Sequence, residues 1–218
     1  MAIDSEWSHG WRRASAATPV VSASTAEAGA RRLIDSSAAG YGRGRWDGGL
    51  YTALDYLTGA ANAGDPGGRL VRRLKARDPA VPALAARLIL KGLVAHERQL
   101  RRHGPRVEII PAPGHEPGPA GSPLHHIRLE LTAAAPWLYY RPGRLVRATE
   151  IRSSRASTHR PSIDEHLATL VCVGRPMVGS IIIDDVFTYG NSSEACRAVL
   201  RGRRTQTLAI ACLARAGG

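Results

Sequence analysis

Two adjacent acidic residues, Asp184 and Asp185, directly follow the β-branched run Ile181–Ile183. Like charges repel each other and are costly to desolvate, so their position at the end of an apolar strand indicates a binding role. The turn 188–192 and a helical pattern reaching Leu200 come next. The first turn of a helix attracts anions, and two carboxylates can hold hydroxyl groups or a hydrated Mg²⁺. This order suits a ligand with a phosphate and a diol close together, such as a ribose 5-phosphate, although any strand–turn–helix of an α/β protein shares its outline.

Strand and helix patterns alternate around this stretch. Alternation of this kind predicts an α/β fold, with a mostly parallel central sheet and helices on both faces. Ligands of such sheets gather at the carboxyl ends of the strands. Apolar runs predict strands at 107–110, near 167–173, at 181–183 and at 205–213, with another at 137–140 or 145–146. Helical spacing predicts helices at 26–38, 51–61, 70–78, 81–102, 124–134 and 194–200, and loops are expected at 41–51, 114–123 and 147–162.

The chain is strongly basic, because 30 Lys and Arg stand against 18 Asp and Glu among 218 residues and give a formal net charge of +12. Only Lys75 and Lys91 are lysines. A basic protein attracts phosphates on nucleotides, nucleic acids or membrane surfaces, although a general bias toward Ala, Arg and Gly produces the same balance. The length predicts one domain with an appendage: an N-terminal arm at 1–60, and an α/β domain at 61–218.

Three cysteines, Cys172, Cys196 and Cys212, stand in apolar contexts without C-x-x-C spacing. They predict buried, reduced thiols rather than a disulfide scaffold or a structural zinc, as in a cytoplasmic protein. No apolar run has the length of a membrane span, and the first 30 residues lack the apolar core of a signal peptide. We therefore expect no membrane partner.

The stretch from Asp184 to Ser192 resembles the phosphoribosyl-diphosphate (PRPP) loop of the type I phosphoribosyltransferases. In that family an apolar strand leads into two acidic residues and then V-x-T-T-G-x-[ST]. This chain reads Asp-Asp-Val-Phe-Thr-Tyr-Gly-Asn-Ser, with Tyr189 at the place of the second Thr. The resemblance implies a type I phosphoribosyltransferase-like fold with an N-terminal helical or hood region in residues 1–60.

More of the chain, roughly 70–215, is similar to the ComF-type branch of that family. Two features differ from the branch: the R-G-F-N-Q run after P-V-P is missing, and so are the N-terminal zinc-binding cysteines. Leu70–Lys75 resembles the branch's basic helix with a lysine, and Pro111–Pro113 resembles its P-V-P. Arg147–Thr149, together with Arg152 and Arg160, resembles its basic flexible region.

The resemblance implies transfer of ribose 5-phosphate from PRPP to a nitrogen nucleophile such as a nucleobase, with release of pyrophosphate and with Mg²⁺ as cofactor. Asp184 and Asp185 would hold the ribose hydroxyls directly or through Mg²⁺, and Arg160 would act in catalysis from a closing loop. The other implied PRPP contacts are Thr188, Tyr189, Gly190, Asn191 and Ser192 around the 5-phosphate, Ala112, Pro113, Gly114 and His115 near pyrophosphate, and Arg147, Arg152 or Arg155 on the diphosphate.

Some roles stay open at this level. His115, Glu116 and His126 are alternative proton donors, and Trp46 and Tyr51 are either base platforms in the hood or residues of a turn with one ring in the core. The main alternative function is a non-catalytic protein that senses PRPP or a nucleotide and binds DNA or RNA, because the chain is basic and its loops differ from the family pattern. A PRPP synthase-like enzyme would need a longer chain. A homodimer is expected only by analogy with the fold.

Overall fold

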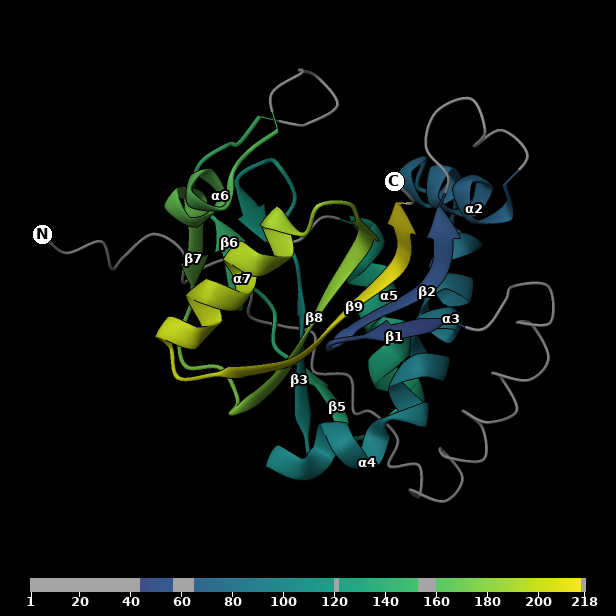
Figure 1. The fold of residues 1–218 in the computed structure, drawn as a ribbon, viewed down its shortest axis with the longest axis horizontal. Helices are drawn as coiled ribbons and strands as arrows, with labels where there is room; N and C mark the ends of the chain where they lie inside the picture. Colours follow the sequence, from purple (N-terminus) through teal and green to yellow (C-terminus); the bar gives the residue numbers. More distant parts are fainter. Residues whose placement is uncertain (1–43, 57–64, 120–121, 153–159, 217–218) are drawn as a thin grey trace, which may run out of the picture.

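The computed structural model describes residues 44–56, 65–119, 122–152 and 160–216 (Figure 1). A six-stranded sheet forms its centre, with strand order β1-β2-β9-β8-β3-β5. Neighbouring strands are parallel, except that β1 is antiparallel to β2. The α/β fold with a mostly parallel sheet is therefore confirmed. The strands are β1 (Arg45–Asp47), β2 (Leu50–Tyr56), β9 (Gln206–Ala216), β8 (Gly179–Phe187), β3 (Val107–Pro111) and β5 (Leu138–Tyr140).

Helices cover both faces of this sheet. Because side chains alternate along a strand, Ile181 and Ile183 of β8 pack in the core under α2 (Pro66–Lys75), α3 (Val81–Ala95) and α5 (Ser122–Ala134). Ile182 points to the other face, where it packs in the core beneath α7 (Asn191–Gly202). The same alternation continues into Asp184 and Asp185, so these two side chains leave the strand toward opposite layers.

A smaller antiparallel sheet stands beside the carboxyl edge of the large one (Figure 1, upper left). It consists of β4 (Gly118–Pro119), β6 (Leu145–Arg147) and β7 (Leu170–Cys172). Helix α6 (Ile163–Thr169) precedes β7 and packs against α7. Its start is fixed by a capping box, because Ser162 accepts from the Glu165 N–H and the Glu165 carboxylate accepts from the Ser162 N–H.

Two predictions for residues 41–61 are wrong where the structure describes them. The basic loop expected at 41–51 contains a β-hairpin, and the helix expected from residue 51 is strand β2 as far as Tyr56. The hairpin turn is Gly48-Gly49, with φ of 53° and 91°, a left-handed pair that glycine tolerates and that two-residue hairpins require. Short apolar runs fit a helix and a strand equally well, and the pairing of β2 with β9 decides between them.

Smaller corrections concern element ends. The long helix expected at 81–102 is interrupted at His96 and continues as α4 (Glu97–Leu100) and a 3-10 turn, η2 (Arg101–His103). The predicted strand near 167–173 begins only at residue 170, after α6, and both alternatives for a strand after α5 form, as β5 and β6. The loop expected at 114–123 contains β4 and the first residues of α5, and α7 starts at 191, three residues earlier than predicted. The helix predicted at 26–38 lies outside the described residues.

Residues 45–56, which we placed in the N-terminal arm, contribute two strands to the central sheet. The division at residue 60 stays a prediction, since residues 1–43 and 57–64 lie outside the described part. None of the helices in the described ranges combines the length and the apolar character that crossing a bilayer requires.

Candidate functional site

The Asp184–Asp185 pair lies near the carboxyl end of β8, between two layers of helices. Asp184 faces α7, where the Ser193 hydroxyl is 3.5 Å from its Oδ2 and donates to it. Asp185 faces α2, where Lys75 Nζ lies 3.3 Å from its Oδ2. Helices from opposite faces of the sheet thus each bring one polar side chain to the pair. The local strand–turn–helix predicted from the sequence is confirmed here.

The surroundings of Asp184 disfavour its charged form. Burial, and next the negative charge of Asp185, raise the pKa of Asp184 from its ordinary value of 3.8 to about 7. The N–H of Asp185 donates to Asp184 Oδ1 at 2.8 Å, and this bond together with Lys75 and Ser193 acts in the opposite direction. The site therefore contains two carboxylates with one nearby ammonium, and a bound cation or a ring of donor hydroxyls would favour the ionised form.

The turn 188–190 connects the pair to the start of α7. Gly190 has φ of 81°, a left-handed conformation that suits glycine, and it is buried against Phe187: a Cβ at Gly190 would lie 2.7 Å from the Phe187 ring. No side-chain hydrogen bond caps the start of α7 within the described residues. Its first N–H groups are therefore oriented for an anion, next to Asp184.

The loop residues predicted to surround a 5-phosphate come together at this helix start. Thr188 is exposed, Asn191 and Ser192 are half-buried in the first turn of α7, and Asn191 Nδ2 donates to the Pro161 carbonyl at 2.9 Å. This last bond connects the loop to the segment that precedes α6. Ser193, which the sequence analysis did not single out, is the hydroxyl that meets Asp184. Ser193 directly follows the 184–192 motif, and this position could have identified it as a candidate site residue.

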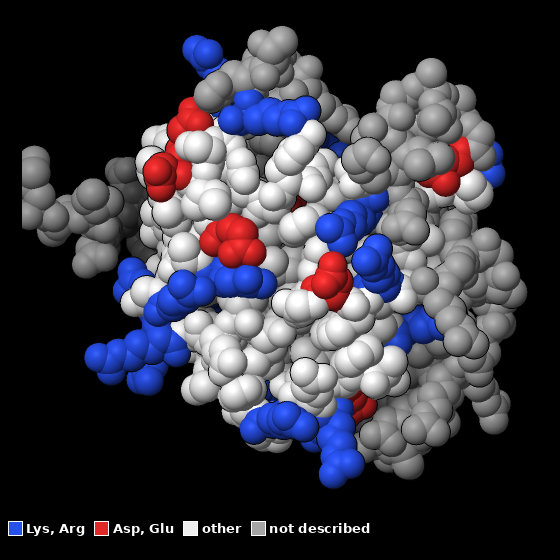
Figure 2. Space-filling model, viewed as in Figure 1, with Lys and Arg blue, Asp and Glu red and all other residues white. Residues whose placement is uncertain are grey.

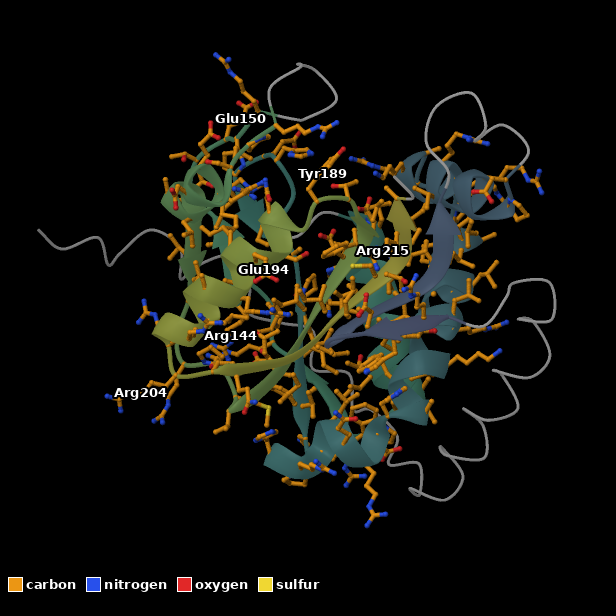
Figure 3. All side chains as sticks on the ribbon, in the orientation of Figure 1. Arg144, Glu150, Tyr189, Glu194, Arg204 and Arg215 are labelled. Carbon is orange, nitrogen blue, oxygen red and sulfur yellow. The ribbon has the colours of Figure 1, made fainter. Side chains whose placement is uncertain are left out.

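Tyr189 points outward from this turn (Figure 3) and is 64% exposed. The guanidinium of Arg160 lies over its ring, with the Arg160 Cζ 4.0 Å from the ring centroid. Such a cation–π contact contributes about 0.5–1 kcal/mol at an exposed site, so a diphosphate can compete for the guanidinium. Arg160, expected to act from the closing loop, is therefore next to the proposed phosphate loop.

The end of β3 forms the neighbouring wall. The N–H of Ala112 donates to the carbonyl of Ile183 at 2.8 Å, which places Ala112 beside the residue that precedes Asp184. Ala112 and Pro113 are buried, and Gly114 and the following residue, His115, are exposed. The pyrophosphate contacts implied by the resemblance thus adjoin the acidic pair through the backbone. Glu116 is also exposed, as is His126 on α5.

Arg147 differs from the expectation of a loop residue that meets the diphosphate. Its side chain is 2% exposed; Nε donates to the Gly114 carbonyl and Nη1 to the Thr169 hydroxyl. Its Nη2 lies 3.4 Å from His166 Nδ1. Burial and the Arg147 charge lower the pKa of His166 to about 4, so this ring is neutral at pH 7. Arg147 thus connects the turn after β3 to α6, and its described partners are groups of the protein itself.

The two aromatic residues considered as base platforms both pack against other residues of the protein. Tyr51 is 3% exposed, and its hydroxyl donates to the Leu88 carbonyl at 3.0 Å, so its ring belongs to the core. Trp46 stacks on His96 at the end of α3, with ring centroids 4.2 Å apart. The alternative of a turn with one ring in the core is correct. Arg152 is exposed, and Arg155 lies outside the described residues.

The arrangement combines two carboxylates, one ammonium, a free helix start and exposed hydroxyls. Carboxylate oxygens suit a hard cation such as Mg²⁺, which takes few protein ligands and completes its shell with water and ligand oxygens. The described residues hold no group of three or more His, Cys, Asp and Glu side chains placed for a metal, so a cation here would use this pair. Comparisons with known proteins add no identity: no protein-family model matches the chain, and no curated protein matches it.

Proposed function

We propose that this protein is a type I phosphoribosyltransferase, which transfers ribose 5-phosphate from PRPP to a nitrogen nucleophile and releases pyrophosphate. One contact carries the proposal: the Ser193 hydroxyl, in the first turn of α7, lies 3.5 Å from Asp184 Oδ2. Asp184 is therefore next to the start of α7, which no side chain caps within the described residues. A diol binder and a phosphate binder are thereby adjacent, and ribose 5-phosphate presents both groups on one ring. The specific resemblance of 184–192 to a PRPP loop agrees with this chemistry.

In the proposed mechanism the residues act by position and charge rather than by covalent attack. Asp184 and Asp185 hold the two ribose hydroxyls, and their negative charge stabilises the oxocarbenium-like transition state. The N–H groups after Gly190 fix the 5-phosphate, so that the ribose carbon meets the nucleophile in one orientation. Arg160 leaves the Tyr189 ring to pair with the departing diphosphate.

Mg²⁺, the cofactor of the proposal, would be held by Asp184 and Asp185. When bound it would neutralise charge on the diphosphate. Lys75 supplies a fixed positive charge beside Asp185 in either case, and it keeps this carboxylate oriented. The acceptor base is not specified by any described residue, and a nucleobase or a related amine is proposed.

The test is calorimetric titration with PRPP, with and without Mg²⁺, on the intact chain and on Asp184→Asn/Asp185→Asn. We expect saturable binding that the double variant weakens at least tenfold. Glu97→Gln/Glu130→Gln is the matched control, because it removes the same charge from the half-buried Glu97 on α4 and the exposed Glu130 on α5, neither of which belongs to the proposed site. Absence of PRPP binding by the folded chain, or equal loss in the control, would rule out the proposal. If the intact chain binds PRPP and the double variant does not, nucleobases are screened next for pyrophosphate release.

A second candidate is a non-catalytic protein that binds PRPP or a nucleotide and contacts DNA or RNA. The exposed ring of Tyr189 under the Arg160 guanidinium favours it, since aromatic and arginine side chains together stack on bases. The net charge of +12 agrees. This candidate predicts PRPP binding without pyrophosphate release for any base, and oligonucleotide binding that weakens steeply with salt.

A further inference from the structure

A polar hollow of about 510 Å³ lies at the edge of the sheet opposite the acidic pair. Its lining residues come from the β1–β2 turn, from α7 and the turn after it, and from the start of β9. On β9, Thr207 lines the hollow, whereas Cys212 is the residue paired with Asp184. These five residues of strand correspond to about 17 Å. The hollow is therefore separate from the proposed PRPP site.

Three arginines, Arg197, Arg201 and Arg204, line this hollow, and no acidic residue does. Figure 2 shows Lys and Arg side chains gathered over this side of the molecule, and Figure 3 labels Arg204 at its margin. Arg197 pairs with Glu194 at 3.1 Å. Neither Arg201 nor Arg204 has an ion pair or side-chain hydrogen bond within the described residues. At least two of the three cations are thus available to an anion.

Polar atoms without partners surround the same space. Among the described residues, the Thr205 and Thr207 hydroxyls and Arg197 Nε are buried atoms with no hydrogen-bond partner. Thr205 as a whole is 4% exposed. A buried polar group left unsatisfied costs about 1–3 kcal/mol, and a ligand in the hollow that reached these atoms would recover part of that cost.

The backbone at Arg204, next to the hollow, is left-handed. The Thr205 N–H bonds to the Leu200 carbonyl and the Arg204 N–H bonds to the Arg201 carbonyl, which together end α7 in a Schellman motif. Arg204 occupies the left-handed position of this motif with φ of 59°, where glycine is usual. A left-handed backbone costs a non-glycine residue about 1–2 kcal/mol. Arg77 has the same conformation after α2, with φ of 60°, so both helices end on a left-handed arginine. Substitution of Arg204 by glycine would relieve this cost.

A simpler account is that basic residues stabilise the negative end of the α7 dipole. That account explains the charge of Arg201 and Arg204. It does not explain the unpartnered hydroxyls at Thr205 and Thr207. It also requires no hollow, and this one has a volume within the range of about 300–1,000 Å³ found for small-molecule sites.

We propose that this hollow, defined by Arg197, Arg201, Arg204, Thr205 and Thr207, is a second anion site that binds the phosphate group of a compact small molecule such as a nucleoside phosphate. Guanidinium groups bind phosphate oxygens bidentately, and threonine hydroxyls supply further donors. The site does not depend on the proposed transferase reaction, because it shares no residue with the acidic pair and its loop.

The test is NMR titration of the labelled chain with inorganic phosphate and then with adenosine 5′-monophosphate. We expect saturable amide shifts at Gly48, Gly49, Thr205 and Thr207. Asp184→Asn/Asp185→Asn should leave these shifts unchanged, so that a failed PRPP site does not obscure the result. Shifts confined to 188–193, or none at all, would overturn the proposal.

Variants test the same site by affinity. Arg204→Gly removes the guanidinium and relieves the left-handed strain, so it should weaken phosphate binding at least tenfold while the melting temperature stays equal or rises. Arg203→Gln is the matched control: it removes one exposed charge from the same turn but does not line the hollow, and binding should change less than twofold. Equal losses in both variants would indicate diffuse attraction and overturn the proposal.

A single-stranded oligonucleotide is the third ligand. The proposed site takes a compact molecule, so the oligonucleotide should bind no more tightly than the monophosphate at this hollow. Much tighter binding, with a steep salt dependence that Arg203→Gln also reduces, would instead identify a nucleic-acid surface and overturn the small-molecule assignment.

Discussion

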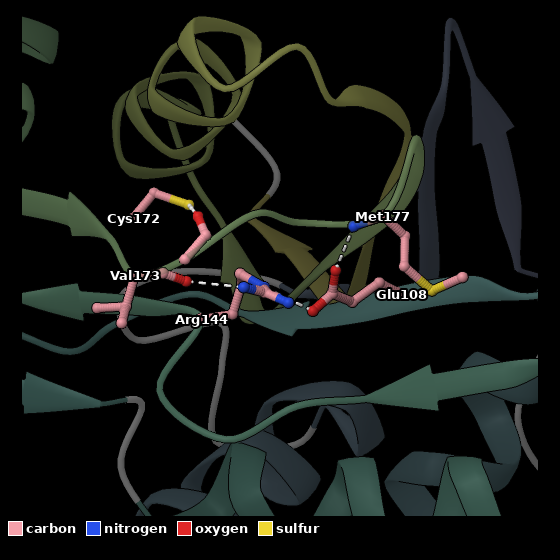
Figure 4. Close-up of polar contacts among 6 residues, drawn as sticks. Glu108, Arg144, Cys172, Val173 and Met177 are labelled. Carbon is pink, nitrogen blue, oxygen red and sulfur yellow. Dashed lines mark hydrogen bonds and ion pairs between the residues drawn. The ribbon is translucent and has the colours of Figure 1, made fainter. Parts of the chain in front are cut away.

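Glu108 and Asp184 are acidic residues on neighbouring parallel strands of one sheet, and their surroundings differ. Glu108 is fully buried, and Arg144, which is 4% exposed, donates through Nε to its Oε1 at 2.7 Å. The Met177 N–H donates to its other oxygen at 2.7 Å (Figure 4). Arg144 Nη1 also reaches the Val173 carbonyl at 2.7 Å. Both oxygens of Glu108 thus have strong donors and the charge is matched.

The acidic pair at the other end of the sheet is not balanced in this way. Two carboxylates share one ammonium, Lys75, and burial raises the pKa of Asp184 to about 7. A buried ion pair whose donors and acceptors all have partners stabilises the loops around it. Arg144 does so for the segment after β7, because it bonds to both Glu108 and the Val173 carbonyl. The pair has only one cation for two carboxylates, so a ligand that brings positive charge or donor hydroxyls can still stabilise its ionised form.

The largest effect is expected for Glu108→Gln. Arg144 would stay buried without its counter-charge, and removal of one partner of a buried ion pair costs about 3–5 kcal/mol. Urea unfolding followed by circular dichroism measures the loss. Glu108→Met/Arg144→Met should recover most of it, because no buried charge is left unpaired. A single variant within 1 kcal/mol of the natural chain would contradict the contrast.

Arg147→Met should have the next largest effect, about 2–3 kcal/mol in free energy of unfolding, because the carbonyl of Gly114 and the hydroxyl of Thr169 lose a charged donor. Thermal unfolding measures it. Arg152→Met, an exposed change in the same segment, is the control and should stay within about 0.5 kcal/mol. If the control is equally damaging, Arg147 has no special structural role.

Gly190→Ala should cost about 1–2 kcal/mol, since φ of 81° is unfavourable for alanine and the new Cβ would press on Phe187. PRPP affinity should fall with it, because the first N–H groups of α7 would shift. Gly202→Ala changes the same residue type at the other end of the helix, where a Cβ meets nothing within 4 Å. It should be neutral or slightly stabilising. Calorimetry of unfolding and of PRPP binding distinguishes the two outcomes.

The smallest expected effect is on the pH dependence of stability. The pKa of Asp184 is raised from 3.8 to about 7, so its ionisation destabilises the folded chain progressively between about pH 4 and pH 7. Asp184→Asn should therefore leave the melting temperature unchanged at pH 4 and raise it by about 2–4 °C at pH 8, which corresponds to roughly 1 kcal/mol. Asp185→Asn, which loses the Lys75 contact, should not show this gain. A gain that is equal at both pH values would contradict the assignment.

Local patterns predicted the secondary structure around the candidate site well. The strand, turn and helix of 180–200 depend on residues close in sequence: β-branched residues, a glycine at a left-handed position, and helical spacing after it. Parallel strands end at one edge, so the nearness of Ala112–Gly114 to Asp184 also follows from the strand assignments. The Gly48-Gly49 turn carried an equally clear hairpin signal, which the helical spacing of the apolar residues after it obscured.

Long-range pairing decided what local pattern could not. Strand β2 forms because β9 offers a parallel edge, and periodicity over seven residues does not reveal that partner. The burial of Arg147 likewise depends on α6 and on the turn after β3, which lie 19 and 33 residues away. The residues next to an arginine in a polar segment do not indicate such contacts.

The sequence alone predicts the alternation of strands and helices, the acidic pair with its loop, and the excess of basic charge. The folded chain is needed to see which charges are matched, which aromatic rings belong to the core, and that three arginines and two threonines line one hollow. Periodicity and turn chemistry act between neighbours in the chain. Burial, pKa shifts and unpaired polar atoms are properties of groups brought together from distant segments.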